Sequence, residues 1–367
     1  MRADGESAQG TPLYFGLAAA CGAAILKKRH REEQRLSSDG HSCGRLKQKG
    51  TCMEYGNPRI LVIGAGVNGS VCAARLHAAG VAVTLLARAQ RLETLQRDGV
   101  VIENPWNQRR TVAKVALTGE LAPSDRYDYI LAVVRRNQVP ALLPVLAANV
   151  SPNVVFMHNN LLGPAEIVQA MGRERVMLGF VFASGKRDGD IIRAFSAPKR
   201  SPMGAPFGEL DGSVTPRLKQ LVSTLRRGGL PARISTNVVD WLATHAAGVA
   251  AIAPMALRYH ADLRALARSR DDLRLMIAAM HEAFSVIEAQ GHKIVPASQK
   301  LLINLPAFVT EQLSRWLFSS RLGEFGASWH VQQAPDEMQA LADDLRQVVL
   351  ASGLPVPALR KVLELPS

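Results

Sequence analysis

The sequence predicts an α/β protein in which a domain built on a parallel β-sheet is followed by an all-helical domain. Between residues 59 and 235, short apolar runs alternate with helical patterns, as in a series of strand–helix–strand units. After residue 236 the strand pattern disappears and only long helical patterns remain. The length of 367 residues fits roughly two domains. We therefore expect a sheet domain over residues 58–235 and a helical domain over residues 236–367.

Residues 1–57 differ from the rest, and we expect them to form a disordered extension. Their apolar run, 13–26, is too short to span a bilayer, and its basic residues follow it, whereas those of a secretory signal precede the apolar run. A weak membrane anchor and an upstream start before Met53 are the alternatives. Because periodic patterning begins only after Pro58, residues 1–52 are expected to be dispensable for folding and cofactor binding.

The composition is that of a soluble globular protein, with 47% hydrophobic and 20% charged residues. The four cysteines form no CxxC pair, so we expect no metal site and a reducing, cytoplasmic location. The net charge of +13 raises nucleic acid as a partner, but the cations are spread along the chain and aromatic residues make up only 5%. No apolar stretch reaches the roughly 18 residues of a membrane-spanning helix. We expect an enzyme with a small-molecule partner, without nucleic acid and without stable membrane insertion.

The clearest motif is the turn Gly64-Ala65-Gly66-Val67-Asn68-Gly69, which follows the apolar run 59–63 and precedes a helical pattern over 70–79. A second apolar run, 81–86, completes the context of a dinucleotide-binding site. Gly64 permits the tight turn, Gly66 lets the backbone approach a pyrophosphate, and Gly69 lets the helix pack close to the strand. The pyrophosphate would lie at the helix N-terminus, where free amides and the dipole favour negative charge. The sequence thus predicts a Rossmann-type domain.

The residue that follows the second strand indicates which nicotinamide cofactor is bound. An acidic residue there accepts hydrogen bonds from the ribose 2′-OH, whereas an arginine pairs with the 2′-phosphate. This chain has Arg88, with Arg91 close by and no acidic residue before Glu93. The pattern favours NADPH, and a solvated arginine on a basic protein is the alternative.

Polar clusters follow two further predicted strands. The run 129–134 is followed by Arg135 and Arg136, and the run 153–157 by His158-Asn159-Asn160. Open α/β sheets place their ligands at the carboxyl ends of parallel strands, so both clusters are candidates for the site. The remaining predictions are strands over 176–183 and 231–235, a turn over 186–189, and helices over 238–260, 271–290, 306–320 and 335–352. A cleft is expected between the two domains.

From residue 58 to the C-terminus, the sequence resembles the ketopantoate reductase (2-dehydropantoate 2-reductase) family. The resemblance rests on motifs in order along the chain: Gly64–Gly69, Leu86-Ala-Arg88, Val134-Arg135-Arg-Asn-Gln-Val139, Met157-His158-Asn159-Asn160, Ala183–Gly189 and Gly353-Leu-Pro-Val-Pro357. It implies NADPH-dependent reduction of a 2-keto acid to a 2-hydroxy acid in the cleft. It also implies that Arg88 and Arg135 bind the 2′-phosphate, and that Asn159 and Glu337 lie at the substrate.

The chain departs from the family on the first helix of the second domain. The family reads Trp-x-Lys-Leu-x-x-Asn-x-x-x-Asn there and uses the lysine to protonate the carbonyl oxygen. This chain carries Ala243, Ala247 and Ala251 at the lysine and asparagine positions. Alanine cannot donate a proton, and general acid catalysis typically contributes about 10² to 10⁴ in rate. The chain therefore looks like a divergent member that lacks the catalytic lysine, with an enlarged and less polar pocket.

Other side chains on or near this helix could supply the proton. His245, beside Thr244, is the first candidate, because an unperturbed imidazole titrates near neutral pH. His330 is the second candidate, and a histidine without a catalytic role is the alternative. Two functions remain open: an NADPH-dependent carbonyl reductase using His245, Asn159 and Glu337, or a non-catalytic NADPH-binding sensor or interaction protein. The substrate, the hydride direction and the choice between monomer and homodimer are not predicted.

Overall fold

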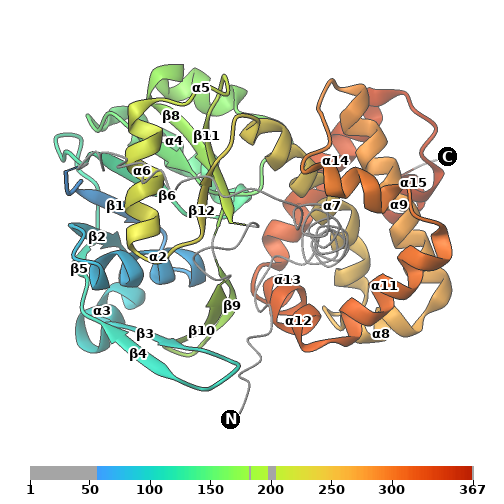
Figure 1. Cartoon of the computed structure of the whole chain (residues 1–367), viewed down its shortest axis with the longest axis horizontal. Helices are drawn as coiled ribbons and strands as arrows, with labels where there is room; N and C mark the ends of the chain where they lie inside the picture. Colours follow the sequence, from blue (N-terminus) through green and yellow to red (C-terminus); the bar gives the residue numbers. More distant parts are fainter. Residues whose placement is uncertain (1–55, 182, 197–203, 366–367) are drawn as a thin grey trace, which may run out of the picture.

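The computed structural model describes residues 56–181, 183–196 and 204–365. The predicted extension, including the segment 1–52 expected to be dispensable, lies almost entirely outside these described residues. A sheet domain and a helical domain stand side by side, and the chain passes from the first to the second between β12 (Ala232–Ile234) and α7 (Val238–Arg258) (Figure 1). The predicted fold class, a parallel-sheet α/β domain followed by a helical one, is confirmed.

The main sheet has eight strands in the order β12-β11-β8-β7-β6-β1-β2-β5. All neighbours in it are parallel except β11 and β8, which run antiparallel. The strands besides β12 are β1 (Ile60–Ile63), β2 (Val83–Leu86), β5 (Ala116–Thr118), β6 (Tyr129–Ala132), β7 (Val154–Phe156), β8 (Val176–Gly179) and β11 (Ala205–Glu209). Every residue of the central strands β1, β6 and β7 is buried, which explains their continuous apolar runs.

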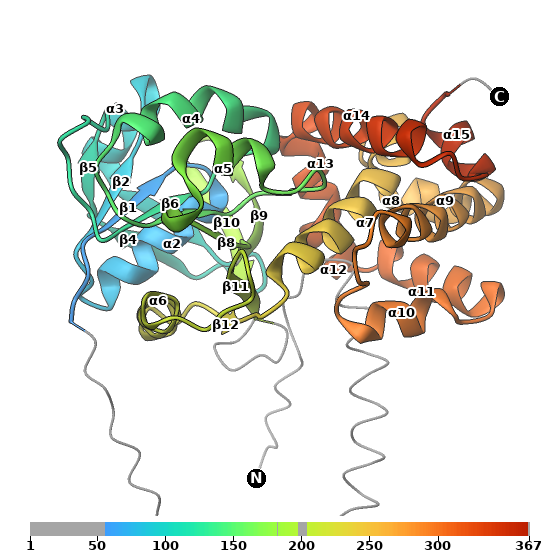
Figure 2. The ribbon, with the colours of Figure 1, turned by 90° about the horizontal axis from the view of Figure 1, so that it is seen from above.

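Helices cover both faces of this sheet. In the view from above, α4 (Val139–Ala148) lies over one face, and α2 (Val67–Ala78) and α6 (Pro216–Arg227) lie over the other (Figure 2). The remaining helices of this domain are α3 (Ala89–Asp98), α5 (Ala165–Met171) and the short 3₁₀ turns η1 (Arg136–Gln138) and η2 (Arg173–Arg175). Because β1, β2, β6 and β7 are parallel, their carboxyl ends lie along one edge of the sheet. The polar clusters predicted for the site follow these strands.

A second, four-stranded sheet was not predicted from the sequence. Its order is β4-β3-β10-β9, with strands β3 (Val100–Glu103), β4 (Arg110–Ala113), β9 (Ala183–Asp188) and β10 (Ile191–Ser196). The predicted strand over 176–183 is wrong in its extent, because β8 ends at Gly179. The predicted turn over 186–189 is also wrong, because Lys186 and Arg187 pair with β10 and the chain turns at Gly189. The sequence of β9 is polar and shows no apolar alternation, so it gives no strand signal of its own. The strand forms because it pairs with β10.

The helical domain is built around α7, which packs against α9 (Arg270–Ala289) and α14 (Pro335–Ser352). The four long helices expected here are present, with ends that differ by at most two residues. The others are α8 (Leu263–Arg268), α10 (Ala297–Ile303), α11 (Ala307–Ser319), α12 (Arg321–Gly323), the π-helix η3 (Glu324–Ser328), α13 (Trp329–Gln333) and α15 (Pro357–Val362). By length and composition α7 is long and apolar enough to cross a membrane, contrary to the expectation from the sequence, but 72% of its apolar window is buried inside the fold. This burial is that of a core helix.

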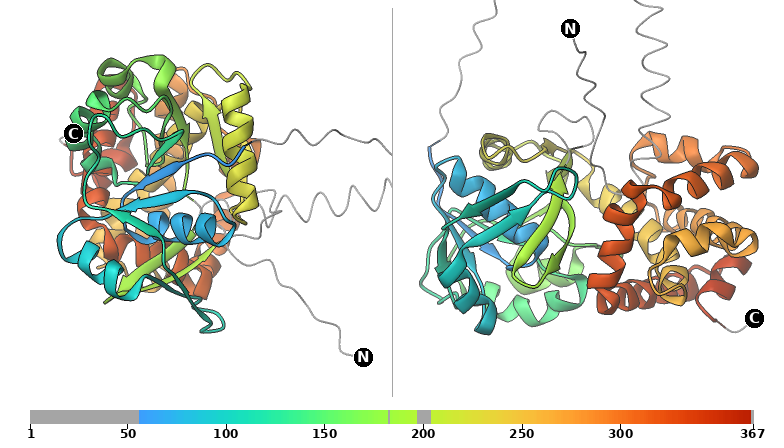
Figure 3. Two further views of the ribbon diagram at one scale, coloured as in Figure 1. Left: turned by 90° about the vertical axis from the view of Figure 1, so that its left-hand side faces the viewer. Right: turned by 90° about the horizontal axis from the view of Figure 1, so that it is seen from below.

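An aromatic cluster joins the small sheet to the helical domain. Phe195 of β10 and Trp106 lie with Phe325 of η3, whose ring centre is 5.1 Å from that of Trp106 and 4.5 Å from that of Trp329. The right-hand view of Figure 3 shows the orange-red segment of α12 and α13 beside the green hairpin of β9 and β10. The two domains are thus held together beside the edge that carries the candidate site.

Candidate active site

The predicted glycine turn connects β1 to α2 and is shaped by two close backbone approaches. Gly64 has φ +109°, and a Cβ there would lie 2.2 Å from the carbonyl oxygen of Val133. A Cβ on Gly69 would lie 1.8 Å from the carbonyl oxygen of Gly64. By contrast, a Cβ on Gly66 would meet nothing within 4 Å. Gly64 and Gly69 therefore hold the strand and helix together, and the space beside Gly66 is open.

The N-terminus of α2 has the features that an anionic group needs. Gly66 is the N-cap residue and provides no side-chain cap, and no acidic residue lies in the first turn. The Asn68 side chain instead accepts a hydrogen bond from the backbone amide of Ala183 at 2.8 Å, which fixes the turn to β9. Ala65 and Val67 are half-buried beside it. The open glycine and the helix N-terminus together fit a pyrophosphate.

Two arginines lie at the carboxyl end of β2. Arg88 is exposed and caps α3, and Arg91 lies in the first turn of that helix. All three guanidinium nitrogens of Arg91 are buried and have no hydrogen-bond partner among the described residues. Burial and the nearby charge of Arg187 lower the pKa of Arg91, and Asp190 acts in the opposite direction. Because a buried guanidinium without partners is costly, this position fits an anion such as the 2′-phosphate of NADPH.

Arg135, the other predicted 2′-phosphate ligand, is engaged by the helical domain. Its Nη1 lies 2.7 Å from Oδ1 of Asp336, and its Nη2 donates to the carbonyl oxygen of Gln333. Asn137 donates to the other oxygen of Asp336 at 2.9 Å. The structure thus places Arg135 in a contact between domains that the sequence did not reveal.

Asn159 and Glu337 meet across the domain boundary. Asn159, which follows β7, donates through Nδ2 to Oε1 of Glu337 at 3.1 Å, although the two are 178 residues apart. Both are buried, at 6% and 4% exposure, and the backbone amide of Arg136 also points at Oε1 of Glu337 at 3.4 Å. His330 lies on the other side, with Nε2 at 3.7 Å from Oε2 of Glu337. The Oδ1 atom of Asn159 has no hydrogen-bond partner in the described part of the chain.

His245 lies between two aromatic rings. It stacks on Trp241 at 5.2 Å with an interplanar angle of 6°, and it meets the edge of Phe180 at 4.4 Å. Burial, with a smaller effect from the charge of His330, lowers the pKa of His245 to about 3. At neutral pH the ring is therefore neutral, so the argument from an unperturbed imidazole does not hold. His245 can donate a hydrogen bond, but it carries no surplus proton to give.

The rest of the α7 face is closed. Ala243 is 2% exposed, and Ala247 and Ala251 are 0% exposed. The burial of these three alanines contradicts the enlarged pocket expected beside them, because a side chain that lines a pocket is exposed to it. Thr244 is also engaged, since its hydroxyl donates to the carbonyl oxygen of Asp240 at 2.8 Å and accepts from the amide of Val295 at 3.1 Å.

Several residues of this site were missed at the sequence level. Asp336 stands directly before Glu337 and could have been noticed as a second acid at the start of the helix. Phe180, Arg187 and Gln333 carry no local signal, because only the folded chain brings them to the site. Among the described residues, no cluster of His, Cys, Asp or Glu could hold a metal ion.

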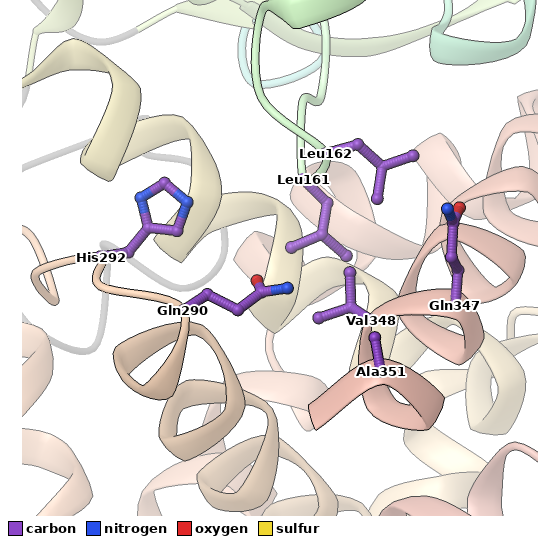
Figure 4. Close-up of a pocket in the computed structure, with 7 residues that line it drawn as sticks. All are labelled: Leu161, Leu162, Gln290, His292, Gln347, Val348 and Ala351. Atoms are coloured by element: carbon purple, nitrogen blue, oxygen red, sulfur yellow. The ribbon is translucent and has the colours of Figure 1, made fainter. Parts of the chain in front are cut away.

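A surface cavity of about 320 Å³ lies on the helical domain near the loop that follows Asn160. Figure 4 shows its lining: Leu161, Leu162, Gln290, His292, Gln347, Val348 and Ala351. None of these residues belongs to the Asn159–Glu337 contact. The cavity is therefore not assigned to the candidate active site.

The family relation follows from sequence and structure together. Residues 60–205 match the family model of ketopantoate reductase PanE/ApbA. This segment of the chain is thus similar to the ketopantoate reductase family. This match confirms the resemblance, and no curated protein gives a significant match to the sequence.

Solved structures share the fold over most of the chain. A PanE/ApbA family ketopantoate reductase from Ralstonia eutropha JMP134 is 20% identical with a TM-score of 0.65, covering 84% of this chain and 96% of its own. D-mandelate dehydrogenase, solved with NADH and anilino(oxo)acetate, is 16% identical with a TM-score of 0.66 over 84% and 96%. A dimeric ketopantoate reductase from Staphylococcus aureus is 14% identical with a TM-score of 0.62 over 83% and 96%. At such identities the likeness establishes the fold. Family and neighbours together support an NAD(P)-dependent oxidoreductase of the ketopantoate reductase type.

Proposed function

We propose that this protein binds NADPH at the β1–α2 turn and reduces the carbonyl group of a 2-keto acid or a related compound to an alcohol. One observation carries the proposal: Asn159 and Glu337, from different domains, form a buried hydrogen bond at 3.1 Å beside His330. A buried polar cluster with an amide oxygen lacking a partner among the described residues is costly without a ligand. A substrate or cofactor group that donates to Asn159 Oδ1 removes this cost.

The residues that would hold the cofactor lie along one edge of the main sheet. The first amides of α2 and the open space at Gly66 suit the pyrophosphate, and Arg88 with Arg91 suits the 2′-phosphate. Bound NADPH would supply the hydride. Every other requirement, namely orientation of the substrate and stabilisation of the developing alkoxide, falls to side chains of this chain.

These side chains divide the work in our proposal. Glu337 accepts a hydrogen bond from a substrate hydroxyl, and Asn159 holds Glu337 in place. His245, neutral in its aromatic surroundings, donates an N–H hydrogen bond to the carbonyl oxygen, which stabilises the alkoxide without a charged acid. His330, whose side chain is 46% exposed, contacts both solvent and Glu337 and delivers the proton.

The competing proposal is a non-catalytic NADPH-binding protein on the same fold. The observation that favours it is the closed alanine face of α7, where the family's lysine and asparagines are absent. A panel of 2-keto acids, ketones and aldehydes, tested for cofactor oxidation with purified protein, separates the two. Turnover of any of these carbonyl compounds supports the reductase, and tight NADPH binding without turnover supports the sensor.

The cofactor is tested by Arg88→Ala. We expect NADPH to bind about tenfold tighter than NADH to the wild-type protein, because a charge-assisted hydrogen bond to the 2′-phosphate is worth about 1.5 to 3 kcal/mol. The variant should lose most of this difference and keep its NADH affinity. Isothermal titration calorimetry measures both constants, and equal affinities in the wild-type protein contradict the NADPH assignment.

The cellular setting belongs to the same proposal. We propose a cytoplasmic protein acting on a small molecule, as a monomer or a homodimer, without nucleic acid or stable membrane insertion. The cation distribution along the sequence supports the absence of nucleic acid. The dimeric state of the Staphylococcus aureus relative supports a homodimer, and sedimentation equilibrium decides between the two states.

A further inference from the structure

Asp336 holds an arginine that the family resemblance assigns to the cofactor. It stands at the start of α14, and its Oδ1 lies 2.7 Å from Nη1 of Arg135 in the other domain. The same guanidinium donates to the carbonyl oxygen of Gln333 through Nη2. Both terminal nitrogens of Arg135 therefore bind groups of the helical domain.

The carboxylate of Asp336 is fixed by a second donor. Asn137, two residues after Arg135, donates to Oδ2 at 2.9 Å. Although partial burial acts to raise it, the pKa of Asp336 is lowered overall by the hydrogen bonds from Asn137 and Arg135. The group is therefore ionised at neutral pH, and both partners sit on the loop that follows β6.

Arg135 and Arg88 follow the two strands that flank β1 in the parallel sheet, since β6 pairs with one side of β1 and β2 with the other. A 2′-phosphate bound at Arg88 therefore lies on the same sheet edge as Arg135. It carries negative charge, as does Asp336, so the two anions compete for one guanidinium and repel each other. A cofactor with a free 2′-OH has no such conflict.

Resting on the proposed NADPH binding, we propose that Asp336 is a specificity-determining residue that weakens the preference for NADPH by competing with its 2′-phosphate for Arg135. NADH leaves the Arg135–Asp336 pair intact. NADPH either displaces Asp336 from Arg135 or binds through Arg88 and Arg91 alone. Cofactor choice is thus set partly from the helical domain, one residue away from Glu337.

The test measures binding with Asp336→Asn, which removes the charge and keeps the size. The probes are NADPH, NADH and the two fragments adenosine 2′,5′-bisphosphate and 5′-AMP, titrated calorimetrically. We expect NADPH and the bisphosphate to bind about tenfold tighter, with NADH and 5′-AMP unchanged. In an Arg135→Ala background, Asp336→Asn should give no gain, since the contested group is gone.

The matched control is Asp343→Asn on the same helix. Asp343 pairs with Arg346 and is 58% exposed. Its substitution changes the net charge by the same amount as Asp336→Asn and leaves the contacts of Arg135 in place. A gain of equal size in this control, an equal gain for NADH, or no change in the NADPH/NADH ratio overturns the inference while leaving the proposed function standing. Wild-type protein that binds neither dinucleotide overturns the proposed function and the inference with it.

Discussion

Two stretches of small residues lie in the two domains, one in each, and small size has opposite consequences in them. In the β1–α2 turn, a side chain added at Gly66 would meet nothing within 4 Å. On α7, Ala247 and Ala251 are completely buried among helices. The first stretch leaves room for a ligand, and the second lets helices approach each other. A small residue therefore leaves space for a ligand only where no other element of the fold packs against it.

The comparison also separates what each half of the site can still do. The turn has open space at Gly66 and an uncapped N-terminus of α2, two features that suit a pyrophosphate. The α7 face carries alanines where the resemblance implies a lysine and two asparagines, and His245 on this helix contacts two aromatic rings. Cofactor binding is thus better supported than the family's own acid chemistry, and any reduction must rely on groups outside the alanine face.

The largest effect is expected from the glycine pair Gly69→Ala and Gly66→Ala. At Gly69 the new Cβ would lie 1.8 Å from the carbonyl oxygen of Gly64, so strand and helix must separate. We expect a loss of more than about 3 kcal/mol in unfolding free energy, measured by urea denaturation. Gly66→Ala should leave this free energy within about 0.5 kcal/mol and weaken NADPH at least about tenfold. If Gly66→Ala binds NADPH normally, the open space does not hold the cofactor.

The sequence predicted the local geometry of the glycine turn better than the contacts that Asn159, Glu337 and Arg135 make between the domains. The turn 64–69 lies within one local strand–helix unit, so its glycine spacing and flanking runs contain the relevant information. The engagement of Arg135 by Asp336 joins residues 201 apart, and no pattern around either one indicates it. Asn159 and Glu337 were selected by resemblance to the family, and their direct contact depends on the tertiary structure.

The same reasoning explains the errors in the fold. Strand β1 has four buried residues in a row and was found at once. Strand β9 has the sequence ASGKRD, with mostly half-buried or exposed residues, and is ordered by its hydrogen bonds to β10. The alanines of α7 were expected to line an enlarged pocket, because the sequence does not show which residues pack against a small side chain.

The second effect, of intermediate size, is expected from Ala243→Lys, which places a lysine where the resemblance implies one. Because Ala243 is 2% exposed in a packed region, an added ammonium group must be buried or must displace a helix. We expect a loss of about 3 kcal/mol in unfolding free energy and no ketopantoate reduction. Ala351→Lys, at an exposed position of α14, is the matched control and should be nearly neutral. A stable variant that reduces ketopantoate means that this face opens onto the cleft.

The smallest effect is a pH dependence that identifies His245 as part of the closed region. Its pKa is lowered to about 3 by burial, whereas an unfolded histidine titrates near 6.5. Between these values the unfolded chain binds a proton that the folded chain does not, so stability falls as the pH drops from about 6.5 toward 3. His245→Gln should reduce this fall by roughly 2 kcal/mol between pH 6.5 and 4.5, measured by urea denaturation at each pH.

The control for this pH dependence is His77→Gln on the exposed side of α2, where the profile should keep its wild-type slope. His158, also fully buried with its pKa lowered to about 3, accounts for part of the remaining slope in the His245→Gln variant. If that variant keeps the full wild-type slope, the imidazole is already protonated in the folded state. The aromatic surroundings would then not exclude water, and His245 could act as a charged proton donor after all, which would remove the contrast between an open cofactor turn and a closed catalytic helix.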